Sequence, residues 1–356
     1  MKPLLLPPNQ PRRFYAGGPA IAALRGTISD DDHVPEDWVG STTTIFGRAR
    51  TGLSVLSDGT VLADAVAANP EAFLGPDHVS AFGPDPAVLV KLLDAGERLP
   101  VHVHPDRSFA ARHLDCRHGK TEAWVVVGTS GPEPVVYLGF RAEVDAGTVA
   151  AWVDRQDTAA LLDALNQVAV RPGDTVLVPA GTPHAIGAGV LIVELQEPTD
   201  FSVLLEWEGF EIDGRSDGHL GLGMDLALQS VDRSAWDGDR LRHHRTDRPA
   251  PADRGGVRPL LPTDADPFFR AERVRPDPIA RLDPGFSILV ALGGSGELST
   301  QAGGDMPLGR GQTVLVPHAA GAAAVSGDLD VVRCRPPTPE QAPRQPDGGA
   351  PARHTA

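Results

Sequence analysis

The amino-acid sequence predicts a mainly β protein made of two related β units, with a small helical insertion in the first unit. Three observations support this prediction: short apolar runs bounded by Gly, Pro and Asp, a seven-residue motif that occurs twice, and two histidines spaced as on one face of a strand. Short interrupted apolar runs are typical of sandwiches and barrels, and a repeated motif indicates a duplicated unit.

The predicted strands are short and apolar. They lie at residues 87–92, 123–127, 175–178, 190–195, 202–205, 287–292, 313–316 and 330–333. One segment has a helical pattern instead, because apolar side chains in residues 148–168 recur every three or four positions and Pro172 follows the last of them. A shorter helix is expected over residues 62–73.

The repeated motif predicts the architecture. Residues 173–179 read GDTVLVP and residues 311–317 read GQTVLVP, so six of the seven positions agree. In each copy a turn glycine precedes an apolar strand that stops at a proline. We therefore expect two β units of one kind.

Composition narrows the classes of function. The hydrophobic fraction of 41% predicts a folded globular protein. No apolar run approaches the roughly 18 residues of a membrane helix, and the N-terminal apolar run is too short for a signal peptide, so we expect a cytoplasmic protein with no membrane partner. The net charge of −15 argues against a nucleic-acid partner. Cys116 and Cys334 lie far apart and are expected to be reduced thiols.

Three separate segments predict one metal site. His102 and His104 stand two residues apart in an extended segment, so their imidazoles point to the same side. His184 follows the first copy of the repeated motif after a tight turn, and Glu122 opens the apolar run AWVVVG. Three imidazoles and one carboxylate suit a single divalent ion, with Zn²⁺ expected first and Fe²⁺, Mn²⁺ or Co²⁺ as alternatives.

The spacings G-x5-HxH with a later Glu, and G-x5-PxG-x2-H, resemble the two motifs of the cupin superfamily. This resemblance implies a two-cupin fold, which is a double β-barrel of the jelly-roll type. In the second copy Gly311 and Pro317 remain, but Ala322 stands where the ligand histidine is expected. The second unit is therefore expected to bind no metal.

Five segments follow from this organisation. They are N-terminal strands and a helix that pack on the barrels (1–80), a metal-binding cupin (81–215) that contains the helical segment 148–168, a connector (216–257), a metal-free cupin (258–335) and a disordered tail (336–356).

Three longer segments resemble the type I mannose-6-phosphate isomerase (phosphomannose isomerase) family. They are VLVKLLDAGERLPVHVHPD at 88–106, GKTEAWVVV at 119–127 and VLVPAGTPHAIGAGVLIVELQEPTD at 176–200. The resemblance implies a zinc enzyme that interconverts mannose 6-phosphate and fructose 6-phosphate by proton transfer through an enediol. It also implies that His104, Glu122 and His184 are zinc ligands.

The same resemblance assigns candidate catalytic and substrate-binding residues. Lys120 and Glu194 match positions at the substrate site of the family and are the candidates to move the proton. Lys91 matches a pocket lysine, and Arg107 lies near the HxH segment, so both are expected to bind the substrate. Only three lysines occur in the chain, and Lys91 and Lys120 are two of them.

Three positions depart from the family pattern. His102 stands where the family has glutamine, Pro100 replaces a serine, and Leu204 replaces an active-site arginine. Losing a guanidinium removes a bidentate partner for a phosphate, so the sugar is expected to be either mannose 6-phosphate or a related sugar without the phosphate.

Other functions fit the same metal ligands. A metal-dependent cupin oxygenase has a similar ligand set, and a sugar-binding regulator would bind metal and sugar without turnover. The expected partner is a small sugar or sugar phosphate, and the expected state is a monomer or a homodimer.

Overall fold

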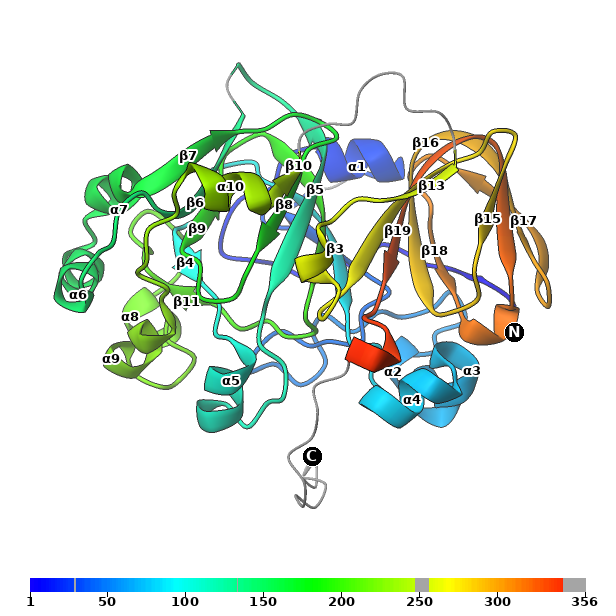
Figure 1. The fold of residues 1–356 in the computed structure, drawn as a ribbon, viewed down its shortest axis with the longest axis horizontal. Helices are drawn as coiled ribbons and strands as arrows, with labels where there is room; N and C mark the ends of the chain where they lie inside the picture. Colours follow the sequence, from blue (N-terminus) through cyan, green and yellow to red (C-terminus); the bar gives the residue numbers. More distant parts are fainter. Residues whose placement is uncertain (29, 133, 247–255, 342–356) are drawn as a thin grey trace.

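The computed structural model describes residues 1–341 apart from residues 29, 133 and 247–255, and it is mainly β (Figure 1). The described strands form three antiparallel sheets, and the short helices lie at the edges of these sheets. The mainly β prediction is confirmed. Within the described residues no helix is both long and apolar enough to span a membrane.

Two sheets make up the first unit. The six-stranded sheet has the order β12 (Arg245–Thr246), β8 (Thr175–Val178), β5 (Glu122–Thr129), β10 (Val190–Gln196), β3 (Leu89–Asp94) and β2 (Glu36–Val39). The five-stranded sheet has the order β11 (Val203–Leu204), β4 (His102–Val103), β9 (His184–Ile186), β6 (Val135–Phe140) and β7 (Leu165–Ala169). Trp124 and Ile192 of the first sheet pack against Leu138 and Ile186 of the second in one apolar cluster, so the two sheets face each other.

The third sheet forms the second unit together with the N-terminal strand. Its strands are β1 (Leu4–Leu5), β13 (Gly256–Pro259), β14 (Arg270–Arg275), β15 (Ile279–Leu282), β16 (Ser287–Thr300), β17 (Gly304–Gly309), β18 (Thr313–Val316) and β19 (Ala323–Arg335). Both halves of the long strand β16 contribute to one apolar cluster, through Leu289 and Leu298, so the sheet curves around its own core.

The two copies of the repeated motif occupy equivalent positions. Gly173 and Gly311 both have positive φ, as their turns require, and each is followed by a buried four-residue strand, β8 or β18. β8 pairs with β5 so that Glu122 lies opposite Val178, and β18 pairs with β16 so that Ser287 lies opposite Val316. The repeat is therefore a duplication of strand register as well as of sequence.

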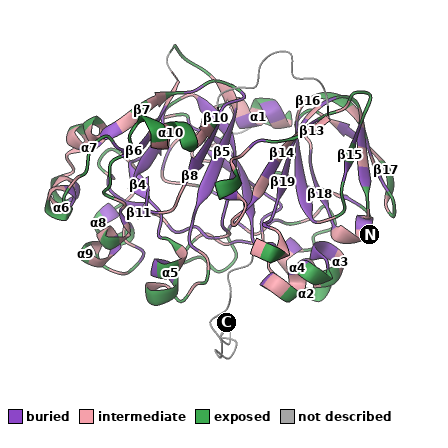
Figure 2. Ribbon diagram, viewed as in Figure 1, coloured by how far each residue is buried: buried purple, intermediate pink, exposed green. Residues whose placement is uncertain are grey.

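The two units share one apolar core between their sheets. Val125 and Val193 on the six-stranded sheet belong to the same cluster as Ile288, Val332 and Cys334 on the third sheet. Figure 2 shows that these central strands are buried along most of their length, whereas exposed residues gather on the peripheral helices. Each unit thus covers a sheet face of the other.

The described helices are short. They are α1 (Ala20–Arg25), α2 (Leu62–Ala68), α3 (Pro70–Leu74), α4 (Pro76–Phe82), α5 (Arg107–His113), α6 (Ala146–Arg155), α7 (Thr158–Ala164), α8 (Gly214–Asp217), α9 (Met224–Ala227) and α10 (Gly238–His243), with 3₁₀ turns η1 (Leu228–Ser230), η2 (Thr263–Ala265), η3 (His318–Ala320) and η4 (Pro339–Gln341). The helix expected over residues 62–73 divides into α2 and α3 at Asn69.

The helix predicted over residues 148–168 is interrupted at Gln156 and Asp157 and ends at Ala164, so the prediction of one continuous helix is wrong. Gln156 takes a left-handed conformation that ends α6, and the Asp157 side chain accepts a hydrogen bond from Ala160 N to begin α7. Residues from Leu165 onward form β7, which pairs with β6. Sheet pairing therefore outweighs the helical spacing of the apolar residues.

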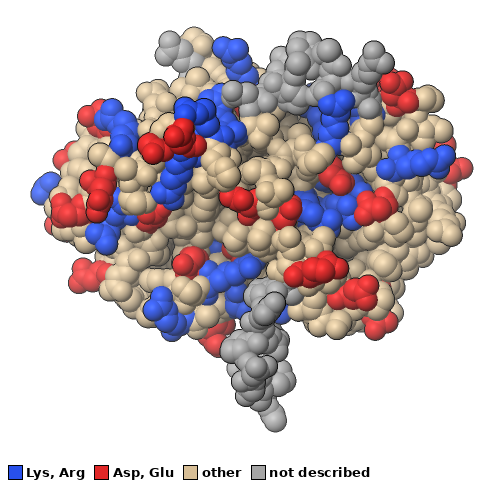
Figure 3. All heavy atoms as spheres, in the orientation of Figure 1, with Lys and Arg blue, Asp and Glu red and all other residues tan. Residues whose placement is uncertain are grey.

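The predicted connector and tail are described only in part. Residues 216–246 contain α9, α10 and β12, and β12 joins the six-stranded sheet. The rest of the connector, 247–255, and the tail from residue 342 lie outside the described residues. Cys116 and Cys334 are free. On the face drawn in Figure 3, basic and acidic side chains are interspersed.

The shared core predicts that the units unfold together. All five tryptophans lie between residues 38 and 236, so their fluorescence reports on the first unit. We expect Ile288→Ala in the second unit to lower the free energy of unfolding by about 2–5 kcal/mol and to shift the fluorescence transition and the circular-dichroism transition equally in urea. Ile279→Ala, at a half-exposed position of the same unit, is the control. Two separate transitions, with the fluorescence one unmoved, would contradict the shared core.

Candidate metal centre and substrate pocket

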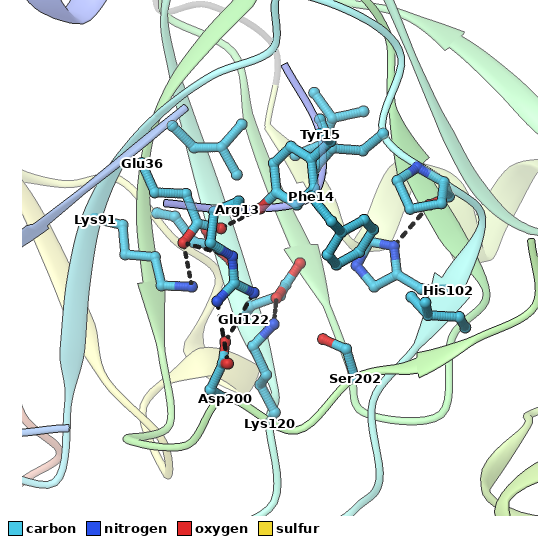
Figure 4. Close-up of a pocket in the computed structure, with 16 residues that line it drawn as sticks. Arg13, Phe14, Tyr15, Glu36, Lys91, His102, Lys120, Glu122, Asp200 and Ser202 are labelled. Carbon is cyan, nitrogen blue, oxygen red and sulfur yellow. Dashed lines mark hydrogen bonds and ion pairs between the residues drawn. The ribbon is translucent and has the colours of Figure 1, made fainter. Parts of the chain in front are cut away.

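A pocket lies between the two sheets of the first unit (Figure 4). Its walls come from the N-terminal segment around Tyr15, from β2, β3, β5 and β10 of the six-stranded sheet, and from the region of β4 and β11 in the five-stranded sheet. Two of the four predicted metal ligands, His102 and Glu122, and both predicted catalytic residues line it.

Three histidines converge at one end of the pocket. His102 in β4 lies directly opposite His184 in β9, and His104 follows two residues after His102. The ring centroids of the three imidazoles are 4.2–4.9 Å apart. One ring nitrogen of each lies within 4.8 Å of the corresponding atoms of the other two, a spacing that suits ligands of a single metal ion.

Each imidazole is held by a main-chain carbonyl. His102 Nδ1 lies 2.8 Å from the Pro100 carbonyl oxygen, His104 Nδ1 2.7 Å from that of Phe201, and His184 Nδ1 2.7 Å from that of Thr182. A carbonyl oxygen only accepts hydrogen bonds, so each Nδ1 carries the proton and donates it. The lone pair of each ring is therefore on Nε2, which is the arrangement found in metal-binding histidines.

Glu122 supplies a carboxylate to the same point. Its Oε2 lies 3.0 Å from His104 Nε2 and its Oε1 lies 3.2 Å from His184 Nε2. Trp124 Nε1 donates to Oε1 at 2.9 Å and fixes the carboxylate. In this tautomer Nε2 and a carboxylate oxygen are both acceptors. The Lys120 ammonium contacts His104 Nε2 and Glu122 Oε2, whereas the approach of His184 Nε2 to Oε1 lacks such a donor.

The protonation states match a metal site. Burial, reinforced by the other histidines, lowers the pKa of His102 well below its usual value. Burial and the Lys120 ammonium lower the pKa of His104 to about 3. Burial alone would raise the pKa of Glu122, but Lys120 and His104 lower it well below its usual range. Neutral imidazoles beside an ionised carboxylate are the forms that bind metals.

The residues therefore fit a divalent ion. His184 Nε2 is buried and has no hydrogen-bond partner among the described residues, and its lone pair faces Glu122 Oε1 at 3.2 Å. A buried polar atom of this kind calls for an explanation, and a cation provides one. The histidine cluster of His102, His104 and His184 can hold a metal ion, and Glu122 lies where it can complete the set.

Lys120 lies beside this cluster. Its Nζ is 2.8 Å from His104 Nε2 and 3.1 Å from Glu122 Oε2. The ammonium thus donates to atoms that a metal would also bind, so the two cations compete for this part of the site.

Glu194 faces the pocket from β10, next to Lys91 of β3 in the strand register. Its Oε2 is buried and has no hydrogen-bond partner among the described residues. Burial raises the pKa of Glu194, and the neighbouring Glu122 carboxylate raises it further. A carboxyl group with a raised pKa beside a candidate metal site is typical of acid–base catalysis.

A second group of charges lines the far end of the pocket. Arg13 NH1 and NH2 each donate to Asp200 at 3.2 Å, and Lys91 Nζ lies 3.6 Å from Glu36 Oε2. Tyr15 Oη and Trp38 Nε1 donate to the same Glu36 carboxylate. Burial would raise the pKa of Glu36, but Arg13 and Lys91 lower it to about 2, so Glu36 stays ionised.

Sequence reasoning missed Arg13, Tyr15, Glu36 and Asp200. Glu36 belongs to the segment EDWVGST, where a weak family signal was available at Trp38. No spacing rule links Arg13 to Asp200, because they are brought together only by tertiary structure.

Arg107, expected to bind the substrate, is not among the residues that line this pocket. Its Nε donates to Glu197, its NH2 donates to the Pro267 carbonyl at 3.0 Å, and its guanidinium lies 4.5 Å from the Phe268 ring centroid. Glu197 also accepts from Thr121 N. Arg107 therefore connects the strand that carries Glu122 to the second unit.

The second unit carries different side chains at the equivalent positions. Ser287 occupies the register position of Glu122. Arg333, opposite Leu289 and Glu272, occupies that of Glu194, which lies opposite Trp124 and Lys91. Within the described part of this unit no group of His, Cys, Asp or Glu has the spacing of a metal site.

Comparison with known proteins finds similarity to mannose-6-phosphate isomerases. Mannose-6-phosphate isomerase ManA of Bacillus subtilis (strain 168) is 29% identical over 219 residues, which cover 60% of this chain and 64% of that protein. Mannose-6-phosphate isomerase of Streptococcus mutans is 29% identical over 208 residues, which cover 56% of this chain and 58% of that protein. Both matches thus span less than two thirds of the relative. No family model matches the chain.

Solved structures agree with the fold. The crystal structure of the mannose 6-phosphate isomerase from Bacillus subtilis matches 94% of this chain and 100% of its own, with a TM-score of 0.75 and 20% identity. A mutant form of the phosphomannose isomerase from Salmonella typhimurium matches 95% of this chain and 100% of its own, with a TM-score of 0.70 and 16% identity. At 20% and 16% sequence identity, this structural similarity establishes the fold alone.

The histidine cluster predicts metal loss on substitution of a ligand. We expect about one divalent ion per wild-type chain. We expect His184→Gln to weaken metal binding by more than roughly a hundredfold, which exceeds the effect of losing a residue that only hydrogen-bonds a metal ligand. Metal analysis after dialysis against a weak chelator measures this, with His243→Gln at an exposed histidine as the control. Equal metal retention in both variants would contradict the site.

The position of Arg107 predicts a structural effect. We expect Arg107→Ala to lower the free energy of unfolding by about 1.5–3 kcal/mol, because the buried Glu197 carboxylate loses its charged partner, and to leave KM within about twofold. Urea unfolding and steady-state kinetics measure the two effects. A large rise in KM with an unchanged free energy of unfolding would instead indicate that Arg107 binds the substrate.

Proposed function

We propose that this chain is a member of the type I mannose-6-phosphate isomerase family and a metal-dependent aldose–ketose isomerase, which its similarity to mannose-6-phosphate isomerases supports. The proposed reaction is the interconversion of mannose 6-phosphate and fructose 6-phosphate, or of the corresponding aldose and ketose of a related sugar. One observation carries this proposal: the candidate metal ligands, a buried lysine and a buried carboxyl group with a raised pKa surround one pocket.

The proposed metal ligands are His102, His104, Glu122 and His184. Nitrogen ligands with one carboxylate suit zinc, which is the first expectation, and Fe²⁺, Mn²⁺ or Co²⁺ also fit. When bound, such an ion supplies Lewis acidity that stabilises negative charge developing on the oxygens at C1 and C2.

Glu194 is the proposed base. In its ionised form it takes the proton from C2 of the aldose, and O1 gains a proton as O2 loses one, so that the enediol intermediate forms; Glu194 then returns its proton to C1 to give the ketose. The unpartnered Oε2 leaves one acceptor available for this transfer. Its burial keeps bulk water away from the carboxyl group, so the proton can pass between the two carbons without being lost.

Lys120 is the alternative acid–base group. Its ammonium contacts His104 and Glu122, so it can donate a proton to a substrate oxygen near the metal site. If it only neutralises Glu122, it orients the ligands instead. Lys91 is the proposed substrate-binding lysine, because it lines the pocket beside Glu194.

The finer architecture is part of the proposal. We expect each unit to be a cupin barrel, with the second free of metal, and the equivalent strand registers of the two units support this. We also propose a cytoplasmic location and a monomeric or homodimeric state.

The isomerase assignment predicts turnover without oxygen. We expect the zinc-loaded protein to convert mannose 6-phosphate or mannose into the ketose under anaerobic conditions, observed by ¹H NMR in D₂O, and the chelator-treated protein to lose this activity. Oxygen uptake by the iron-loaded protein without isomerisation would identify an oxygenase. Metal and sugar binding without turnover would identify a regulator.

The assignment of Glu194 predicts a defined pH profile. A base acts when ionised, so a raised pKa places the rising limb of kcat above the usual range of a glutamate, and kcat falls as pH drops through that pKa. We expect Glu194→Gln to lower kcat by about 10²–10⁴-fold and to remove this limb, with Glu297→Gln at an exposed position as the control. Retained turnover in Glu194→Gln, lost in Lys120→Gln, would assign the base to Lys120.

A further inference from the structure

Two strands of the six-stranded sheet carry a glutamate and a tryptophan two positions apart. They are Glu36 and Trp38 in β2, and Glu122 and Trp124 in β5. Side chains at i and i+2 of a strand lie on the same face. Trp38 Nε1 donates to Glu36 Oε2 at 2.6 Å, and Trp124 Nε1 donates to Glu122 Oε1 at 2.9 Å. Both tryptophans are 0% exposed, so the same pattern gives the same buried hydrogen bond twice.

The two glutamates serve different parts of the pocket. Strands β10 and β3 separate β5 from β2 in the sheet. Glu122 approaches two of the clustered imidazoles, whereas Glu36 contacts Arg13 and Lys91. Figure 4 shows the same separation, with Glu122 beside Lys120 and Glu36 beside Lys91. The hydrogen bond of Trp124 is therefore the one that acts on the candidate metal centre.

Trp124 can support a metal ligand without competing for the metal. An indole N–H group only donates, so it cannot bind a cation itself, and a carboxylate oxygen that accepts from it keeps a second lone pair. A hydrogen bond to an ionised carboxylate is stronger than one between neutral groups.

The indole ring of Trp124 also contacts a second candidate ligand. Its centroid lies 5.5 Å from that of the His184 imidazole, and the two ring planes are inclined by 62°, which is an edge-to-face arrangement. One buried side chain thus restrains Glu122 through its N–H group and His184 through its ring.

We propose that Trp124 is a positioning residue of the metal centre, which sets metal affinity by holding Glu122 and His184 in the orientations that bind the ion. This inference rests on the metal site of the proposed function and adds a residue that acts without touching the metal. Trp38 makes the equivalent hydrogen bond to Glu36, which is not a proposed ligand, so it has no such role.

The first test compares two matched variants. Trp124→Phe removes the indole N–H group and keeps an aromatic ring, and we expect it to raise the Kd for zinc by about 10–100-fold, the usual effect of losing a residue that hydrogen-bonds a metal ligand. Trp38→Phe removes an equally buried donor from the same sheet and should leave this Kd within about twofold. Competition with a chromogenic chelator measures zinc affinity, and circular dichroism checks that each variant is folded.

The outcomes separate a positioning role from a structural one. A structural role alone would lower the free energy of unfolding of the metal-free protein in both variants and leave their zinc affinities equal. Equal zinc affinity in Trp124→Phe and the wild type would overturn the inference and leave the metal site intact. A wild-type protein that binds no zinc would overturn the metal site and the inference together.

The second test observes the hydrogen bond in the wild-type protein. With ¹⁵N-labelled tryptophan, NMR resolves the indole N–H groups of the five tryptophans, and single Phe variants of the other four identify their signals. We expect the remaining signal, that of Trp124, to shift as zinc is added and to stop shifting at one ion per chain, because the ion withdraws charge from the carboxylate that accepts this hydrogen bond. A Trp124 signal that stays in place while zinc binds would overturn the inference. A folding defect in Trp124→Phe does not affect this result.

Discussion

Three imidazole–carbonyl hydrogen bonds hold the candidate metal centre together. Each ties a ring nitrogen to the main chain, at Pro100, Phe201 or Thr182, and so determines which nitrogen carries the proton and where the other one points. Main-chain carbonyls are themselves held by the strands, so the orientation of the rings follows from the pairing of β4 with β9 and β11. The site is rigid because the sheet is.

The second unit stabilises this sheet without sharing its chemistry. Its strands repeat the register of the first unit, yet Arg333 and Glu272 reverse the charges of Glu194 and Lys91. Arg333 is 2% exposed and donates to Glu272 and Asp283, so an ion pair occupies the position equivalent to that of Glu194 and Lys91. Removing either carboxylate would weaken the charge compensation of the buried Arg333 guanidinium, so these residues stabilise the second unit.

The sequence was sufficient for features that depend on short spacings. Two histidines at i and i+2, and a histidine after a turn, gave the metal cluster because strand geometry fixes where such side chains point. The sequence was insufficient for features whose position depends on tertiary contacts. Arg13 contacts Asp200 although 187 positions separate them in sequence. Arg107 turns toward Pro267 although it is near His104 in sequence, and the residues from Leu165 onward pair with β6 instead of continuing the helix.

Main-chain and side-chain roles separate at two positions, and this separation explains how the fold can persist while specificity changes. Pro100 positions His102 with its carbonyl oxygen, which every residue type possesses, so this hydrogen bond does not depend on the side chain at position 100. Leu204 pairs with His102 through the backbone of β11, whereas its side chain lines the pocket. A substitution at position 204 therefore keeps the backbone pairing of β11 with β4 and changes the lining of the pocket. Positions that hold the candidate metal ligands through the backbone are thus positions at which the side chains lining the pocket can differ.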